Sequence, residues 1–275
     1  ERDTQKRVVA LFRDTLGYAH LGDWRDRANN SNVEPDLLAA FLRKSGYSEG
    51  HITKAVYDFQ TEARNLNRSL YDNNKRIYQL LRYRLPVRLG VSENTETVWL
   101  IDWQHPTRND FALAEEVTLK GPLERRPDLV LYVNGIAIAV IELKNGRVSI
   151  GDGIRQLISN QSPEFHAWFF STVQLVFAGN DSEGLQYGTI GTEEKMFLRW
   201  KEDPSDNADL KLDKYFQKMC RKERLLELIH DFVLFDGGKK KLPRVHQYFG
   251  IKAAQDYVHR RECGIIWHTQ GSGKS

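Results

Sequence analysis

The chain has 275 residues, of which 40% are hydrophobic and 28% charged, and its formal net charge is +3. This length is enough for one large domain or two smaller ones with a sizeable core, and the composition is that of a folded globular protein. No apolar run approaches the roughly 20 residues of a membrane-spanning helix, and the charged beginning of the chain does not resemble a secretory signal. We therefore expect a cytoplasmic protein without a membrane partner. The two cysteines are far apart and near no His/Cys pair of metal-binding spacing, which argues against a disulfide framework or a structural zinc site.

The first 90 residues predict a helical region. Apolar residues recur at helical spacing over 4–16, over 33–45 and over 50–84, and the last two ranges together predict two or three helices, ended by Pro86. Within it, Arg68 to Arg88 contains six basic residues and one acid, with three tyrosines interleaved. Such a stretch could lie along a phosphate backbone, or it could be a solvated helix face whose tyrosines pack inward. The sequence leaves both interpretations open.

From about residue 97 the pattern becomes that of β-strands. Runs rich in β-branched and aromatic residues predict strands at 97–103, 128–133, 136–143 and 172–179. A helix is predicted over 149–160, and helix again dominates from 208 to 234. We therefore expect an α/β fold in which helices flank a central mixed sheet.

The sequence FDGGKKKLPRVHQ, residues 235–247, interrupts these patterns with two glycines, three lysines and a proline. We predict a domain boundary there, near residue 237. The first domain, 1–236, would comprise the helical region to about 90, a sheet core at about 95–200 and closing helices at 208–234. Residues 237–275 would be a linker and the start of a second domain.

A strand pair within PDLVLYVNGIAIAVIELKN, residues 127–145, combines apolar runs with charged ends. The run 136–141 is apolar on both faces, as a central strand covered on both sides requires. Glu142 and Lys144 follow it two residues apart, so they project from one face. The question is whether Asp128, at the start of the preceding strand, faces the same side.

The turn at Asn134 and Gly135 decides that question. A two-residue turn would pair Val133 with Ile136 and point Asp128 away from Glu142. A three-residue loop with Gly135 left-handed would place Asp128 opposite Val140 and diagonal to Glu142 on one face. A bulge elsewhere in the strand pair would restore the same arrangement. We expect the loop or the bulge, because the chemistry below needs both acids together.

Two carboxylates and an ammonium at a rigid strand end suit phosphodiester hydrolysis. Asp128 and Glu142 would hold Mg²⁺, which polarises the scissile phosphate and lowers the pKa of a bound water. Lys144 would orient that water or balance the developing charge. The bare spacing of these residues is a weak signal, since acids and lysines are common. The alternative is that Glu142 and Lys144 merely mark a strand end that reaches water.

A second motif, GIIWHTQGSGKS, occupies residues 264–275. A predicted strand runs into a loop whose backbone, at Gly271, Ser272 and Gly273, would bind nucleotide phosphates, with Lys274 on the β/γ-phosphates and Ser275 on Mg²⁺. The full phosphate-loop pattern has glycine where this chain has His268. The alternative is a chance turn of small residues. A working ATPase also needs a following helix and an acidic motif, so we expect the chain to be the front part of a longer protein.

Together these features resemble the N-terminal part of the restriction (R) subunit of type I restriction–modification enzymes. The likeness spans nearly the whole chain and is carried, in order, by LIDWQHPTRNDF (100–111), RPDLVLYVNGIAIAVIELKN (126–145), RQLISN (155–160), RVHQYFGIKAA (244–254) and GIIWHTQGSGKS (264–275).

The resemblance implies a PD-(D/E)xK nuclease fold followed by the first strand and phosphate loop of a RecA-like, superfamily 2 translocase. It places the catalytic positions on Asp128, Glu142 and Lys144. It also implies a Gln-x-x-x-Tyr motif on the next helix, of which Gln156 matches whereas Asn160 replaces the tyrosine. Arg244 and Gln247 resemble an adenine-contacting motif; otherwise they are a polar helix start.

The same resemblance implies a Mg²⁺-dependent, ATP-dependent deoxyribonuclease that acts on double-stranded DNA with methylation and specificity subunits. A competing hypothesis is an inactive nuclease-like module for DNA binding or subunit docking, which Asn160 favours. A third is a helicase-like ATPase without nuclease activity. If Asp128 and Glu142 lay on opposite faces of the strand pair, they could not share a metal, and the hypothesis of an inactive module would be favoured.

Overall fold

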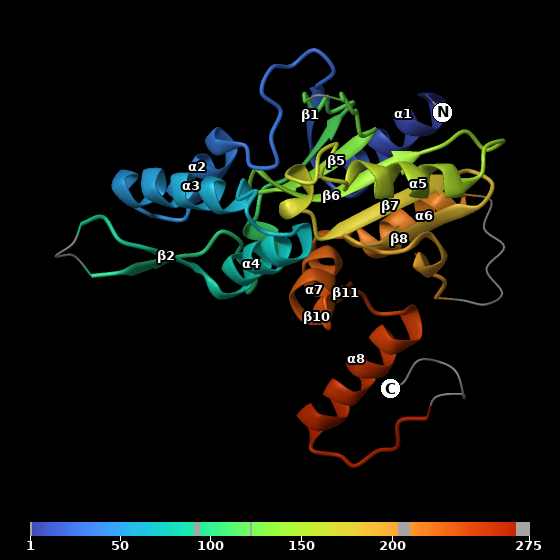
Figure 1. Cartoon of the computed structure of the whole chain (residues 1–275). Coiled ribbons are helices and arrows are strands. Elements are labelled where there is room, and N and C mark those ends of the chain that lie inside the picture. Colours follow the sequence, from blue (N-terminus) through green and yellow to red (C-terminus); the bar gives the residue numbers. More distant parts are fainter. Residues whose placement is uncertain (1, 91–93, 122, 203–209, 268–275) are drawn as a thin grey trace.

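A computed structural model of the chain describes residues 2–90, 94–121, 123–202 and 210–267 (Figure 1). Its main feature is a mixed sheet of seven strands in the spatial order β1–β4–β5–β6–β7–β8–β9. These strands are β1 (Ala19–Asp23), β4 (Phe111–Glu115), β5 (Leu129–Val133), β6 (Ile136–Leu143), β7 (Leu175–Asn180), β8 (Gly184–Gly188) and β9 (Leu198–Arg199). The predicted α/β class with a mixed central sheet and flanking helices is confirmed.

Two of the strand pairs are parallel and the others antiparallel. The parallel pairs are β1 with β4 and β6 with β7. Helix α5 (Ile150–Asn160) makes the crossover from β6 to β7 and lies along both strands (Figure 1). Its first turn is capped by Ser149, whose hydroxyl accepts the N–H of Gly151 at 3.2 Å. The prediction of a helix over 149–160 is thus confirmed.

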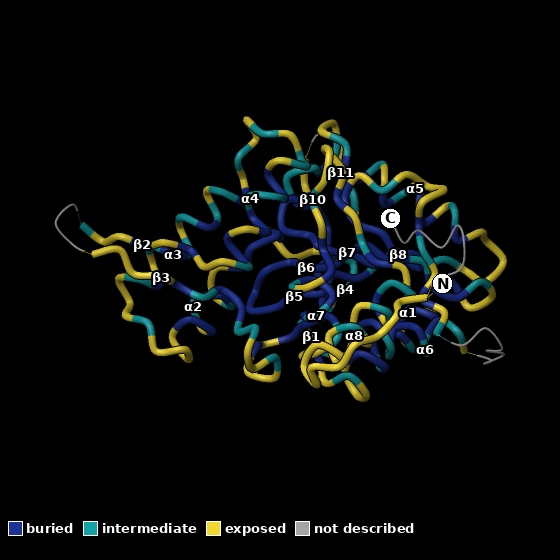
Figure 2. The backbone as a smooth tube through the Cα atoms, turned by 90° about the horizontal axis from the view of Figure 1, so that it is seen from below, coloured by how far each residue is buried: buried dark blue, intermediate teal, exposed yellow. Residues whose placement is uncertain are grey.

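Helices and irregular segments cover both faces of the sheet with separate apolar cores. One core contains α1 (Arg2–Ala10), the following π-helical turn (Leu11–Thr15), α2 (Pro35–Lys44), α3 (Glu49–Ala63), α4 (Leu70–Tyr83), α6 (Lys211–Met219) and α7 (Lys222–Phe232). The other core contains α5 and the short 3-10 turn Phe169–Ser171. Strands β5, β6 and β7 are buried along their whole length, as Figure 2 shows. The charged end of β6 therefore belongs to a rigid, doubly covered element.

Some strand predictions were wrong, for local reasons. The predicted strand 97–103 is reduced to β3 (Glu96–Val98), which pairs with β2 (Leu85–Val87) outside the central sheet. Beyond it, the Asp102 carboxylate accepts the N–H groups of Gln104 and His105, and this turn ends the extended backbone. Strand β1 lay in the region predicted as helical, because its sequence AHLGD lacks an alternating apolar pattern.

After α7 the chain forms a small hairpin and one more helix. The hairpin consists of β10 (Leu234–Asp236) and β11 (Lys239–Lys241), and Gly237 and Gly238 form its turn with positive φ. The predicted domain boundary near 237 falls in this turn. Helix α8 (Val245–Arg260) follows, and residues 264–267, predicted as a strand, pair with no strand of the described ranges. None of the described helices is both long enough and apolar enough to cross a bilayer.

Candidate active site

The turn between β5 and β6 has two residues. Asn134 and Gly135 have φ values of 52° and 78°, and Val133 pairs directly with Ile136. These are the left-handed conformations of the tightest hairpin turn, for which Asn-Gly is the preferred sequence. The three-residue loop was therefore the wrong expectation, and by itself this turn would send Asp128 to the face opposite Glu142.

A β-bulge in β6 corrects the register. Tyr132 pairs with Ala137 but Leu131 pairs with Ala139, which leaves Ile138 as the extra residue. Ile138 and Ala139 consequently both pack into the same core, although they are neighbours. The compensating bulge is the alternative that the structure confirms.

Beyond the bulge, the strand pair brings the two acids to one face. Val130 pairs with Val140 and Leu129 with Ile141, so the same register sets Asp128 directly opposite Glu142 rather than diagonal to it. Residues directly opposite in an antiparallel pair have Cβ atoms about 5 Å apart. Val130 and Val140 pack into the core beneath α5, so Asp128, Glu142 and Lys144 lie on the α5 side.

The side chains at this strand end are held in place individually. The Asp128 carboxylate accepts the backbone N–H of Leu143 at 2.6 Å, which ties β5 to the end of β6. Glu142 is fully buried, and the Lys144 ammonium lies 3.9 Å from its Oε2 atom. Lys144 also donates a 2.8 Å hydrogen bond to Oε1 of Gln156 on α5. The structure thus joins Glu142, Lys144 and Gln156 in one polar chain.

The backbone of α5 lies directly over Glu142 and Lys144 at Gly153, a residue outside the predicted motifs. A Cβ atom there would be 3.4 Å from Cγ of Lys144 and 3.7 Å from Cβ of Glu142. A glycine in the middle of an otherwise regular helix is the signal that could have identified this close packing.

Asn160, at the position of the family's tyrosine, does not join the site. It lies one helical turn beyond Gln156 and is fully buried, and neither its side-chain oxygen nor its nitrogen has a hydrogen-bond partner in the described part of the chain. Of the predicted positions in this region, the structure brings together Asp128, Glu142, Lys144 and Gln156.

The donor set of this site suits a hard cation with few protein ligands. Mg²⁺ prefers oxygen ligands at about 2.1 Å, keeps several waters, and is commonly bound by one or two carboxylates together with substrate phosphates. Asp128 and Glu142 supply two carboxylates on one face. Within the described ranges, no group of three or more His, Cys, Asp or Glu side chains could hold a metal. A site for Mg²⁺ here would therefore leave most coordination positions to water and phosphate.

Two other ionisable side chains near α5 stay neutral. Burial raises the pKa of Tyr132 well above its usual 10, and its hydroxyl donates to the carbonyl of Ser31 at 3.0 Å. Burial also lowers the pKa of His166, against the effect of a 2.8 Å hydrogen bond between its Nε2 and the carbonyl of Leu123. Both groups therefore have packing roles, whereas Lys144 forms an ion pair with Glu142.

Two of the predicted nucleotide-binding residues, Arg244 and Gln247, lie at the start of α8. Arg244 precedes the first residue of α8, and its backbone N–H donates to Oε1 of Gln247 at 2.8 Å, a helix-capping arrangement. Gly271, Ser272, Gly273, Lys274 and Ser275 lie outside the described residues. Their assignment remains a prediction from the sequence.

The basic stretch 68–88 proves to be partly structural. Tyr71 and Tyr78 of α4 pack against Phe235 of β10, with ring centroids 5.6 and 5.3 Å apart. Tyr83 is 66% exposed, and the Arg82 guanidinium lies over its ring. The inward-packing interpretation is thus confirmed for two of the three tyrosines.

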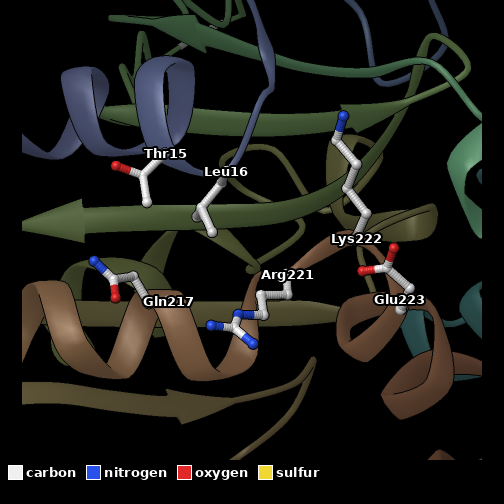
Figure 3. Close-up of a pocket in the computed structure, with 6 residues that line it drawn as sticks. All are labelled: Thr15, Leu16, Gln217, Arg221, Lys222 and Glu223. Carbon is white, nitrogen blue, oxygen red and sulfur yellow. The ribbon is translucent and has the colours of Figure 1, made fainter.

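An open cavity of about 360 Å³ lies on the other side of the sheet (Figure 3). Its lining comes from the end of the π-helical turn, from α6 and from the start of α7. The residues are Thr15, Leu16, Gln217, Arg221, Lys222 and Glu223. This lining contains a single carboxylate, so it lacks the paired acids of the strand end.

Both ends of the chain match known protein families. Residues 1–195 match the family described as "Type I restriction enzyme R protein N terminus", and residues 246–275 match the SWI2/SNF2 ATPase family. The chain is 29% identical over 226 residues to the type I restriction enzyme HindI endonuclease subunit of Haemophilus influenzae, covering 74% of this chain and 21% of that protein.

Two putative type I restriction enzyme endonuclease subunits of Methanocaldococcus jannaschii are also similar. MjaIXP is 27% identical over 229 residues, covering 69% of this chain and 22% of that protein. MjaVIIIP is 30% identical over 200 residues, covering 65% and 18%. The chain thus spans about a fifth of the length of these relatives.

Proposed function

The chain belongs to the family of type I restriction enzyme R protein N termini, and from this premise we propose that it carries the Mg²⁺-dependent nuclease site with which such an enzyme cuts double-stranded DNA. The names of its relatives, which are endonuclease subunits, support a restriction endonuclease role. The proposal includes a PD-(D/E)xK type of nuclease fold. It also includes ATP-driven translocation, cleavage of unmethylated DNA, and assembly with methylation and specificity subunits.

One observation carries the proposal: the bulge at Ile138 puts Asp128 and Glu142 on the same face, beside Lys144. Without it, the two-residue turn would separate the acids. An inactive docking module would not require both acids on one face, so the bulge favours an active site over that alternative.

The side chains would divide the work as follows. Asp128 and Glu142 would hold Mg²⁺, which when bound polarises the scissile phosphate and acidifies a water. The Lys144 ammonium would orient the attacking water and offset the charge that develops on the phosphate. Gln156 would keep Lys144 in position through their 2.8 Å hydrogen bond. Burial of Glu142 and the bond from Leu143 to Asp128 would fix both acids before the substrate arrives.

The motor part of the proposal rests on the C-terminal residues. The match of residues 246–275 to the SWI2/SNF2 ATPase family supports a RecA-like domain that begins there. Arg244 and Gln247 would contact the adenine of ATP. The loop from Gly271 through Ser275 would hold the phosphates and Mg²⁺.

The test is ATP-dependent cleavage of unmethylated plasmid by the complete enzyme complex, with ATP hydrolysis measured in parallel. Lys144→Ala should abolish cleavage and leave ATP hydrolysis intact, because its ammonium serves the nuclease site alone. Lys274→Ala should abolish both, since translocation precedes cleavage. Normal cleavage by Lys144→Ala would refute the assignment of the nuclease site.

A further inference from the structure

The bulge in β6 is held by hydrogen bonds with residues that are distant in the sequence. The N–H of Gln174 donates to the carbonyl of Ile138 at 2.7 Å, and the hydroxyl of Thr172 donates to the carbonyl of Ala137 at 2.7 Å. Ala137 also donates its N–H to the carbonyl of Asn32 at 2.9 Å. The extra residue, and with it the face on which Glu142 lies, therefore depends on the position of residues 172–174.

Gln174 is fully buried, and its side chain is engaged at both ends. Its Nε2 donates to the carbonyl of Thr172 at 2.7 Å, while its Oε1 accepts a 2.7 Å hydrogen bond from Nζ of Lys240. Its own carbonyl accepts the hydroxyl of Thr189 at 2.7 Å. Gln174 thus connects Ile138 to Lys240 through its own atoms.

Lys240 is a buried lysine that donates hydrogen bonds to two side-chain amides and lies over the Phe235 ring, with Nζ 5.3 Å from the centroid. It lies on β11, is 6% exposed, and donates to Oδ1 of Asn74 at 2.8 Å as well as to Gln174. Burial lowers the pKa of Lys240 well below its usual value. A lysine is costly to bury, so its place in the core calls for a specific role.

The hairpin that carries Lys240 docks on one face of α4. Phe235, opposite Lys240 in the hairpin, packs between Tyr71 and Tyr78, and Asn74 lies between these tyrosines at helical spacing. Asn74 also donates to three carbonyls of the segment that leads into β7, those of Phe170, Ser171 and Val173. The hairpin therefore packs against the same face of α4 from which Asn74 holds residues 170–173 in position.

This hairpin is also the covalent connection to the part of the chain that matches the ATPase family. Residues 246–275 match that family, and α8 begins four residues after β11 ends. Lys240 thus links the β10–β11 hairpin, which leads into the ATPase-like part of the chain, to Gln174, which holds the bulge.

We infer that Lys240 is a positioning residue for the nuclease site. It holds the β10–β11 hairpin against Gln174, and through Gln174 it stabilises the β6 bulge that places Glu142 beside Asp128. The effect on cleavage rests on the proposed function. The physical link from Lys240 to the bulge does not, so the two are tested separately.

The link is tested by amide hydrogen exchange on this chain. Lys240→Met keeps an unbranched side chain that is one atom shorter, but leaves the oxygens of Asn74 and Gln174 without their donor. Exchange over 136–142 and at Gln174 should become about tenfold faster, while exchange over 184–188 in β8 stays unchanged. The matched control is Lys239→Met on the same strand, since Lys239 is exposed and its loss should change neither segment.

Unchanged exchange over 136–142, or a uniform increase in every segment, would overturn the link. If Lys240→Met does not fold, Lys240→Gln retains an N–H donor on a shorter side chain. Lys240→Gln should also speed exchange over 136–142 and at Gln174, by a smaller factor than Lys240→Met. Unchanged exchange there in Lys240→Gln would equally overturn the inference.

The consequence for cleavage is tested in the complete enzyme complex. Lys240→Met should cut plasmid about tenfold more slowly and need more Mg²⁺ for half-maximal cleavage, because the two acids are less well placed, with ATP hydrolysis within about twofold of wild type. Lys239→Met should match wild type in all three measurements. Cleavage by Lys240→Met at the wild-type rate and Mg²⁺ requirement would refute the positioning role. If the wild type showed no Mg²⁺-dependent cleavage, the proposed function would be refuted. The link between Lys240 and the β6 bulge would then be judged from hydrogen exchange alone.

Discussion

The two ends of the β5–β6 strand pair differ in the polar groups that they bury: neutral hydrogen-bonding groups at the turn and ionisable groups at the open end. At the turn, the fully buried Asn134 side chain donates to the carbonyl of Leu100 at 2.9 Å and to Oδ1 of Asn109 at 2.8 Å, and it accepts the N–H of Asp110 at 2.8 Å. All of these partners are neutral. At the open end, Glu142, Lys144 and Gln156 bring two ionisable groups and an amide together.

The contrast shows how one strand pair separates stability from chemistry. Neutral hydrogen bonds at the turn satisfy buried groups and fix the register. Charged groups at the open end contribute little to the fold, because burying them costs free energy that their attraction must offset. Substitutions at the turn should therefore change the free energy of unfolding, and substitutions at the open end should change the reaction.

The largest effect is expected for Glu142→Gln. Removing the charge of a metal ligand forfeits several kcal/mol of transition-state stabilisation, so cleavage by the complete complex should fall about a thousandfold. The free energy of unfolding should not fall by more than about 1 kcal/mol, since the variant no longer buries a carboxylate. The exposed Glu164→Gln is the matched control, and cleavage by Glu142→Gln within tenfold of wild type would break the contrast.

At the turn, Gly135→Ala should lower the free energy of unfolding by about 3 kcal/mol, from left-handed strain together with overpacking. A Cβ there would lie 2.7 Å from Cβ of Leu37 and 2.8 Å from the carbonyl oxygen of Glu34. Gly191 has a similar φ of 68° but open space around it, so Gly191→Ala should cost only about 1 kcal/mol. Chemical denaturation measures both, and equal losses would contradict the role of close packing at the turn.

Gln156→Leu tests the open end without removing a charge. Losing the hydrogen bond to Lys144 should slow cleavage about 10- to 100-fold, as expected for a bond to a charged group, and leave ATP hydrolysis unchanged. Leucine at the exposed Gln79 of α4 serves as the control. A wild-type rate for Gln156→Leu would show that Lys144 needs no partner on α5.

The smallest effect is expected at Asn160, which is buried as fully as Asn134 but lacks its hydrogen bonds within the described residues. Asn160→Leu should raise the free energy of unfolding by about 1 kcal/mol, because it removes a desolvated amide. Asn134→Leu should lower it by about 3 kcal/mol, through lost hydrogen bonds and left-handed strain. A loss at Asn160 equal to that at Asn134 would indicate that its amide is satisfied in solution.

The sequence by itself determined the helices at 33–45, 50–84 and 149–160, the apolar strands at 128–143, and the acids and lysine at their charged end. These features depend on local periodicity and residue type, which a single segment carries. The family likeness rested on the same residues.

Only the tertiary structure decided that the acids share a face. The Asn-Gly turn alone would place them on opposite faces. The bulge at Ile138 is held by hydrogen bonds from Thr172 and Gln174 and by one to the carbonyl of Asn32, and these three residues are remote in sequence from the strand pair. Strand β1 and the burial of Lys240 are likewise fixed by partners elsewhere in the chain. A backbone or ammonium group must find its hydrogen bond wherever the folded chain supplies one, and no local pattern records where that is.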